Sequence, residues 1–272
     1  MKKYLFIFSI LLFLVNPSMT MADENQNILR MQELSIKVMP EFAYHLNDVE
    51  KNHPPLLIGY QGTLLNQSLQ PQKGQIELPL PIEDKNFRIG YVADYSSDLS
   101  KVYEIEYIID QEKGTISWTT SEEIQPNEVY KFVVEFYTNN IIVEEDRKSV
   151  AYQFKSFTDI GFFNLTFTPP IGAAKIDLSP APEKNKSHGD EEGVYSYNVQ
   201  GMKAGDEKSI VLTYERSETK PSIELMEQQP EQTADNENKK SPEILSIAAI
   251  SGVGLIGAGA FTFILKRKKT KK

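Results

Sequence analysis

The residues with the clearest chemical potential lie in one short loop at 187–193, where two glycines flank a histidine and three carboxylates. Calcium prefers carboxylate oxygens as ligands, and a histidine nitrogen suits transition metals such as copper. The loop therefore provides a candidate metal site, made of His188, Asp190, Glu191 and Glu192. Its spacing differs from that of an EF-hand loop, so a solvated acidic tip is the competing interpretation.

A second acidic cluster lies in the middle of the chain. Glu144, Glu145 and Asp146 stand together, with Arg147 and Lys148 directly after them. Charges of both signs in so short a run are typical of an exposed turn. We expect this cluster to form the charged end of a hairpin.

The sequence predicts no catalytic centre. It has three histidines and no cysteine, which excludes thiol nucleophiles, thiolate metal sites and disulfide bonds. The HExxH, GxSxG, P-loop and GxGxxG motifs are all absent. We therefore expect a protein that is not an enzyme and needs no cofactor. A hydrolase with a carboxylate pair is an alternative, because two of the 38 acidic residues could meet in space while far apart in sequence.

The N-terminal end predicts export. Lys2 and Lys3 precede an apolar run at 4–15, and small residues before Asp23 provide a cleavage site. This order is that of a secretory signal peptide, which we assign to residues 1–22. The apolar run is too short to cross a membrane as a helix.

The C-terminal end predicts a membrane anchor. Residues 244–265 contain no charged side chain and are long enough for a transmembrane helix. Six cations follow in the basic tail 266–272, which favours a cytoplasmic tail and an external N-terminal part. We expect a single-pass protein of the cell membrane whose tail contacts anionic lipid. Small residues four apart in the span also allow helix–helix self-association; these are Ala248 with Gly252 and Gly254 with Ala258.

The part between these ends is strongly acidic. It carries all 38 acidic residues but only 21 of the 29 basic ones. Such a surface repels phosphate backbones, so we expect no nucleic-acid partner. An exported part without cysteine is typical of Gram-positive bacteria, whose surface proteins do not depend on disulfides.

Alternating apolar residues predict strands through most of the external part. We expect an all-β fold with two β-sandwich-like units in tandem, at 23–156 and 157–217, followed by the C-terminal transmembrane helix. With about sixty residues the second, smaller unit is marginal alone, so it is expected to share the core of the first or extend one of its sheets. Residues 218–243 predict a flexible acidic stalk, and no helix is predicted outside the two ends. The alternating sets include Leu34/Ile36/Val38, Phe87/Ile89/Tyr91, Tyr103/Ile105/Tyr107/Ile109, Phe163/Leu165/Phe167 and Ile210/Leu212/Tyr214.

The segment 124–136 places a proline-led turn before Tyr130, at the head of a strand with bulky alternating residues. This segment resembles the tyrosine corner of immunoglobulin-like and fibronectin type III sandwiches. The resemblance covers residues 30–156 and implies that the Tyr130 phenol bonds back to the backbone, with Trp118 filling the core one strand earlier. A tyrosine that simply packs in the core is the alternative.

The order of signal, sandwich and span is also similar to that of membrane-tethered copper-handling proteins of bacteria. The resemblance implies a histidine ligand at the mature N-terminus. Here the expected mature start is Asp23 and the nearest histidine is His45, which departs from that pattern.

These features together predict a non-catalytic, membrane-anchored extracytoplasmic binding protein of the bacterial cell envelope. Its expected partner is an envelope protein or the cell wall. Extracytoplasmic metal binding, as in calcium or copper handling, is the alternative function.

Overall fold

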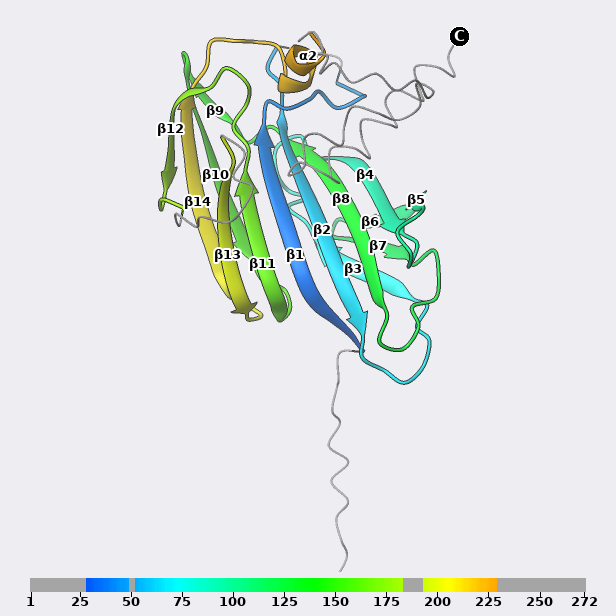
Figure 1. Ribbon diagram of the computed structural model, residues 1–272. Helices are drawn as coiled ribbons and strands as arrows, with labels where there is room; N and C mark the ends of the chain where they lie inside the picture. Colours follow the sequence, from blue (N-terminus) through cyan, green and yellow to red (C-terminus); the bar gives the residue numbers. More distant parts are fainter. Residues whose placement is uncertain (1–27, 49–51, 183–192, 229–272) are drawn as a thin grey trace, which may run out of the picture.

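The computed structural model describes residues 28–48, 52–182 and 193–228, which form three β-sheets and one short helix (Figure 1). The largest sheet has seven strands in the order β13-β11-β1-β2-β8-β4-β5. Their bounds are β1 Leu29–Pro40, β2 Leu56–Asn66, β4 Arg88–Tyr95, β5 Val102–Glu104, β8 Val129–Thr138, β11 Ile160–Phe167 and β13 Tyr195–Met202.

Two smaller sheets pack on one face of the large sheet. The four-stranded sheet has the order β12-β14-β10-β9, and the three-stranded sheet has the order β3-β7-β6. Their bounds are β3 Gln75–Pro79, β6 Tyr107–Asp110, β7 Thr115–Thr119, β9 Ile142–Glu144, β10 Arg147–Lys155, β12 Ala174–Ser179 and β14 Glu207–Glu215. Phe154 of β10 stacks on Phe163 of β11 at 4.8 Å between ring centroids, and Trp118 of β7 lies 5.3 Å from Phe132 of β8. Each small sheet therefore covers a different part of the same face.

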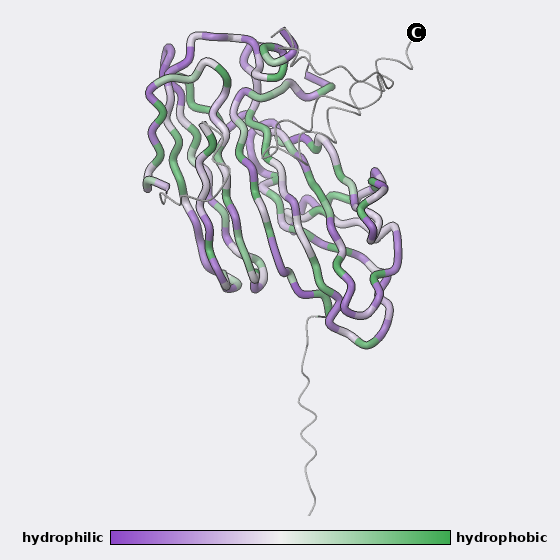
Figure 2. The backbone as a smooth tube through the Cα atoms, in the orientation of Figure 1, coloured by the Kyte–Doolittle hydropathy of each residue, from purple (hydrophilic) through white to green (hydrophobic). Residues whose placement is uncertain are grey.

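The alternation in the sequence explains which face of the large sheet is buried. Leu34, Ile36 and Val38 of β1 are all fully buried in the main core. The residues between them face the other side of the sheet, because successive side chains in a strand alternate. Figure 2 shows the same alternation of hydrophobic and hydrophilic residues along most strands.

The strands on both sides of residue 156 belong to one sheet. Strand β1 pairs with β2 in antiparallel fashion and with β11 in parallel, and β13 pairs with β11. The main core contains side chains from both 23–156 and 157–217. The described part of 157–217 thus extends a sheet of the preceding unit and shares its core.

Two details differ from the expected strands. The run 103–109 is not one strand, because the chain leaves the large sheet after β5 and enters the three-stranded sheet at β6. Phe87, Ile89 and Tyr91 do not share a face, because the β4–β8 register shifts between Ile89 and Tyr91. Phe87 and Ile89 pack against the main core, whereas Tyr91 lies on the opposite face of the sheet.

That opposite face carries a second apolar cluster. Its members come from four neighbouring strands of the large sheet and from the segment that follows β1. They are Met39, Leu57, Tyr91, Ala93, Val133 and Tyr137, with Phe42 and Tyr95 packed against them. The large sheet therefore carries apolar side chains on both faces, with the smaller cluster opposite the main core.

The one helix of the described residues, α2 (Ser222–Met226), was not expected. It lies beside the segment after β1, where the Ser222 amide donates to the Glu41 carbonyl and the Ile223 amide donates to the Phe42 carbonyl. The first residues of the predicted stalk are therefore attached to the sandwich. Among the described residues no helix is both long and apolar enough to span a membrane. Residues 1–22, 244–265 and 266–272 lie outside the described part.

Candidate interaction surface and buried charge cluster

The predicted metal ligands His188, Asp190, Glu191 and Glu192 lie outside the described residues. Within the described part of the chain, no three His, Asp or Glu side chains are grouped as a metal site would require.

His45, the histidine nearest the expected mature start, contacts neighbouring elements of the fold. Its Nε2 atom donates to the Ile89 carbonyl at 3.0 Å, and its ring meets Tyr137 edge to face. Burial lowers the pKa of His45, with a smaller opposing effect from the bond to the Ile89 carbonyl. This side chain is held by packing and by its hydrogen bond.

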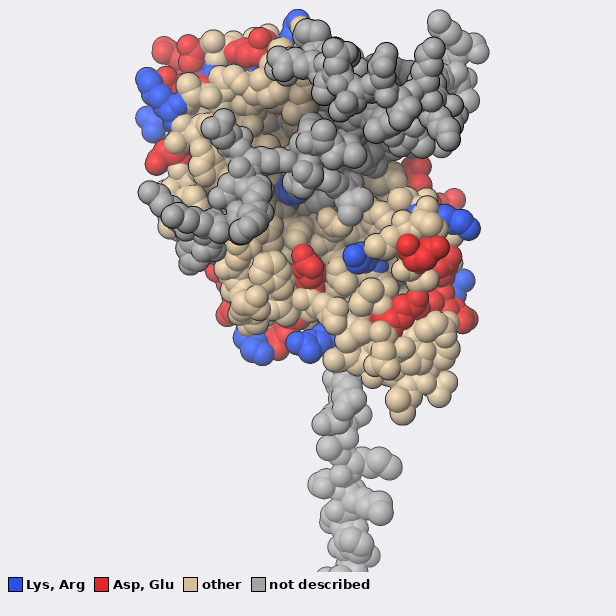
Figure 3. Space-filling view, viewed as in Figure 1, with Lys and Arg blue, Asp and Glu red and all other residues tan. Residues whose placement is uncertain are grey.

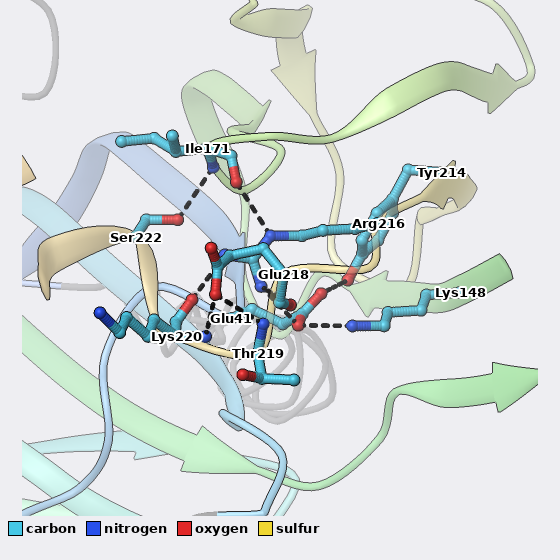
Figure 4. A network of polar contacts seen from close by, with 9 residues as sticks. All are labelled: Glu41, Lys148, Ile171, Tyr214, Arg216, Glu218, Thr219, Lys220 and Ser222. Carbon is cyan, nitrogen blue, oxygen red and sulfur yellow. Dashed lines mark hydrogen bonds and ion pairs between the residues drawn. The ribbon is translucent and has the colours of Figure 1, made fainter. Parts of the chain in front are cut away.

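A buried charge cluster forms where three distant parts of the chain meet (Figure 4). The Glu41 carboxylate accepts from Lys148 Nζ at 2.7 Å, from Arg216 Nη1 at 2.8 Å and from the Tyr214 hydroxyl at 2.7 Å. All four residues are buried. Burial, followed by the adjacent Glu41 charge, raises the pKa of Tyr214, so its hydroxyl stays protonated and donates. A buried carboxylate is tolerable here because three donors replace its lost hydration.

Arg216 connects this cluster to the segment that leaves the sandwich. Its Nε donates to the Ile171 carbonyl at 2.9 Å, Nη1 donates also to the Glu218 carbonyl at 2.9 Å, and Nη2 donates to the Lys220 carbonyl at 2.6 Å. The Ile171 amide in turn donates to the Ser222 hydroxyl at 3.0 Å. The cluster thereby ties residues 218–222 to the β11–β12 connection and to the residue after β1.

No pattern in the sequence predicts this cluster. Glu41, Lys148 and Arg216 have no common motif. The pairing of β10 with β14 brings Lys148 and Arg216 close together, and packing of their sheet against the large sheet adds Glu41. Residues 144–147 do form the turn of the β9–β10 hairpin, as expected. Lys148 points inward and is only 7% exposed, however, although it was expected at a charged hairpin end. Lys148 lies two residues before Val150 in the same alternating series of β10, and this charged residue in an apolar series was the one signal available.

Tyr130 has a different role from that implied by the tyrosine-corner resemblance. Its hydroxyl donates to Asp94 Oδ2 at 2.9 Å and accepts from Trp118 Nε1 at 2.8 Å. Both partners are side chains rather than backbone groups. Trp118 is buried in the main core, as expected. Tyr130 is thus a core tyrosine that joins the three-stranded sheet to the large sheet.

Glu135 of β8 is a second buried carboxylate. It lies on the same face as the smaller apolar cluster and is 0% exposed, and neither of its oxygens has a hydrogen-bond partner among the described residues. Lys37 of β1 and Glu135 of β8 are both paired with Gly59 of β2, so the three residues lie in one row across the sheet. Burial raises the pKa of Glu135 to about 8, and the smaller effect of the Lys37 charge opposes this rise.

Several exposed apolar side chains lie at one edge of the molecule. Strand β5 ends the large sheet and β6 ends the three-stranded sheet, so each has one edge without a neighbouring strand among the described residues. The chain between the β4–β5 turn and β6 exposes large apolar side chains. These are Leu99 at 51%, Val102 at 49%, Tyr107 at 40% and Ile108 at 69% exposed. We call residues 99–108 the edge segment.

Hydrogen bonds hold the turn that begins the edge segment. Asp98 Oδ1 accepts from the Ser96 hydroxyl at 2.7 Å, the Ser100 hydroxyl at 2.7 Å and the Ser100 amide at 3.0 Å. The bonds from Ser100 and then that from Ser96 lower the pKa of Asp98 to about 2. Leu99 next to it has a φ of 60°, a left-handed conformation uncommon for such a residue. The turn therefore presents Leu99 outward in a defined conformation.

The surroundings of the edge segment are acidic. Between residues 98 and 123 the sequence has seven acidic side chains and two lysines. Figure 3 shows acidic side chains gathered on the side of the molecule where Figure 1 labels β5 and β6. The edge segment thus combines exposed apolar groups, unpaired strand edges and negative charge.

Comparison with known proteins finds no family model and no curated relative that matches the chain.

Proposed function

We propose that the chain is a membrane-anchored extracytoplasmic binding protein of the bacterial cell envelope that acts without catalysis. The signal-peptide pattern at 1–22 and the apolar run at 244–265 with its basic tail support export and anchoring. The sandwich would then present a surface to an envelope partner.

The edge segment is the observation that carries this proposal. Exposed strand edges invite pairing with another chain, and proteins usually block them with charge or a covering loop. Here two edges lie close together in sequence and carry exposed apolar groups, with Ile108 at 69% exposure the most prominent. A partner that adds an extended strand would gain backbone hydrogen bonds from the edge and specificity from the side chains.

Charge defines the class of that partner. The acidic surroundings of β5 and β6 favour an extended segment with alternating apolar and basic residues. The function therefore rests on recognition of such a segment in another envelope protein.

A cysteine-directed cross-linker tests this proposal in the full chain, because the natural sequence has no cysteine. The test variant is Ile108→Cys and the control is Val211→Cys. Val211 is exposed (41%) and lies in β14, an inner strand of the four-stranded sheet. On intact cells, a membrane-impermeant photo-crosslinker should label both variants. Only the Ile108→Cys variant should capture a defined partner. Adding Glu104→Lys and Glu106→Lys to this variant should reduce the capture.

Two results would contradict the proposal. If the impermeant reagent labels neither cysteine on intact cells, this part of the chain does not face the outside of the cell. Equal capture from positions 108 and 211 would show that the edge segment has no special role.

A further inference from the structure

A separate cavity opens at the end of the sandwich beside the buried charge cluster. It has a volume of about 170 Å³. Pockets for drug-sized ligands usually begin at about 300 Å³, so this cavity suits a smaller group. Lys148 and Glu41 line it together with apolar walls from Pro54, Pro55 and Ile141.

The buried charges beside the cavity do not balance. Two cations, Lys148 and Arg216, face one carboxylate, Glu41, and all three side chains are at least nine-tenths buried. Arg216 gives its remaining hydrogen bonds to backbone carbonyls, which carry no net charge. The solvent-accessible Glu218 carboxylate also interacts with the Arg216 charge, but water screens it. The buried groups of the described cluster therefore retain one positive charge, which is costly to leave uncompensated.

The donors of Lys148 show where a counter-charge would bind. An ammonium group has three protons to donate. One hydrogen bond of Lys148 is accounted for among the described residues, the bond to Glu41 at 2.7 Å. Glu41 already accepts from three donors, so it is a poor acceptor for further bonds. The other two Lys148 protons have no acceptor among the described residues, so an acceptor in the cavity that this side chain lines could take them.

The rim of the cavity adds the exposed His53, whose imidazole can donate or accept, and two further donor groups. Lys85 provides a second, exposed cation, and Asn139 provides an amide whose oxygen already accepts from Arg88 at 3.4 Å. We propose that the cavity binds a carboxylate attached to a small apolar group, as found at the C-terminus of a peptide. The carboxylate would lie on Lys148, and the apolar group would contact the proline walls.

A carboxylate fits better than a phosphate dianion. One negative charge compensates the single excess buried positive charge, whereas a second would have to lie at the exposed rim with Lys85, where a solvated charge pair contributes little. The apolar walls also favour a ligand with a carbon side chain over an inorganic ion. This site is built from residues outside the edge segment and does not depend on the partner proposed for it.

The test uses the full-length chain in detergent micelles and three probes, measured by titration calorimetry. N-acetyl-Ala-Ala with a free carboxylate should bind, its C-terminal amide should bind at least tenfold more weakly, and inorganic phosphate should bind more weakly than the free acid. Lys85→Ala should lower the affinity for the acid about two- to fivefold, the range expected for an exposed charge pair. Lys155→Ala is the matched control, because this lysine lies on the same strand as Lys148 and is exposed.

Lys148→Met should abolish binding of the acid, and its far-ultraviolet circular dichroism would show whether the variant folds. If it does not fold, the amide probe and Lys85→Ala still decide the question. Equal affinity for acid and amide, tighter binding of phosphate, or no binding of the acid at millimolar concentration would each overturn the proposal.

Discussion

The hydroxyl of Tyr130 lies 2.9 Å from Oδ2 of Asp94 and 2.8 Å from Nε1 of Trp118, so one buried phenol joins two sheets. Asp94 belongs to β4 of the large sheet, and Trp118 belongs to β7 of the three-stranded sheet. Asp94 Oδ2 also accepts from the Ser121 amide at 2.8 Å. Burial, and then the Asp94 charge, raise the pKa of Tyr130, which keeps the phenol a donor.

Tyr130→Phe should destabilise the protein by about 1–3 kcal/mol. The substitution keeps the ring but leaves the Trp118 donor without its buried acceptor and removes one of the two donors to Asp94 Oδ2. Urea unfolding followed by tryptophan fluorescence measures the change. Tyr103→Phe is the control, because that hydroxyl bonds to Glu122 at the surface and its loss should cost less than about 0.5 kcal/mol. Equal effects of the two substitutions would contradict the role assigned to Tyr130.

Arg216→Met should cost about 3–5 kcal/mol of unfolding free energy, the range for breaking a buried ion pair from one side. The substitution also removes the hydrogen bonds that Arg216 donates to three backbone carbonyls. Proteolysis should then cleave sooner within 218–222, since Arg216 holds that segment. The comparison is Lys203→Met, which breaks an exposed pair with Asp159 at 2.8 Å and should cost no more than about 1 kcal/mol. A loss at Arg216 as small as that at Lys203 would contradict a buried cluster.

Glu135 should make the protein less stable as the pH rises. Its folded pKa is about 8 against an ordinary value of 4.5, so between these values the folded state binds more protons than the unfolded state. Unfolding free energy therefore falls with rising pH across this window, by on the order of a few kcal/mol. Glu135→Gln should remove this fall and stabilise the protein at pH 8. Chemical unfolding at several pH values measures how the unfolding free energy changes with pH. Glu33→Gln, at an exposed position, is the charge-matched control.

Gly62→Ala should destabilise the core by about 1–3 kcal/mol, the usual cost of overpacking. Gly62 of β2 lies opposite Phe132 of β8, and a Cβ atom on Gly62 would overlap the Phe132 ring. Gly74→Ala is the control, because a Cβ atom there would meet nothing within 4 Å. Thermal unfolding of both variants compares the sites. A similar melting temperature for the two would show that the ring can move aside.

Local alternation was sufficient to predict the all-β class and many strands. Strand β1 and strand β11 were expected from apolar residues two apart, and these side chains are buried. The position of β5 and β6 in different sheets could not be predicted, because 103–109 keeps its alternation while the chain crosses between sheets. The register shift between Ile89 and Tyr91 in the β4–β8 pair could not be predicted either. Such an irregularity turns the Tyr91 side chain to the other face of the sheet, while the alternation of residue types stays the same.

The charge cluster and the edge segment depended on contacts over long distances. Glu41 and Arg216 meet only after β1 and β14 have taken their places, so no local pattern indicates their pairing. The edge segment was expected as strand, but its exposure depends on which strands end each sheet. Sequence reasoning instead selected His188 and its acidic neighbours, where residue types alone indicate metal chemistry.

The parallel pairing of β1 with β11 has a consequence for biosynthesis. A ribosome releases β1 early, yet the strand that completes its second side begins only at Ile160. Until then that side of β1 remains an unpaired edge beside apolar side chains, a state that invites aggregation. A fragment that stops at residue 156 would keep this edge permanently, and we expect it to aggregate more readily than a chain that includes β11.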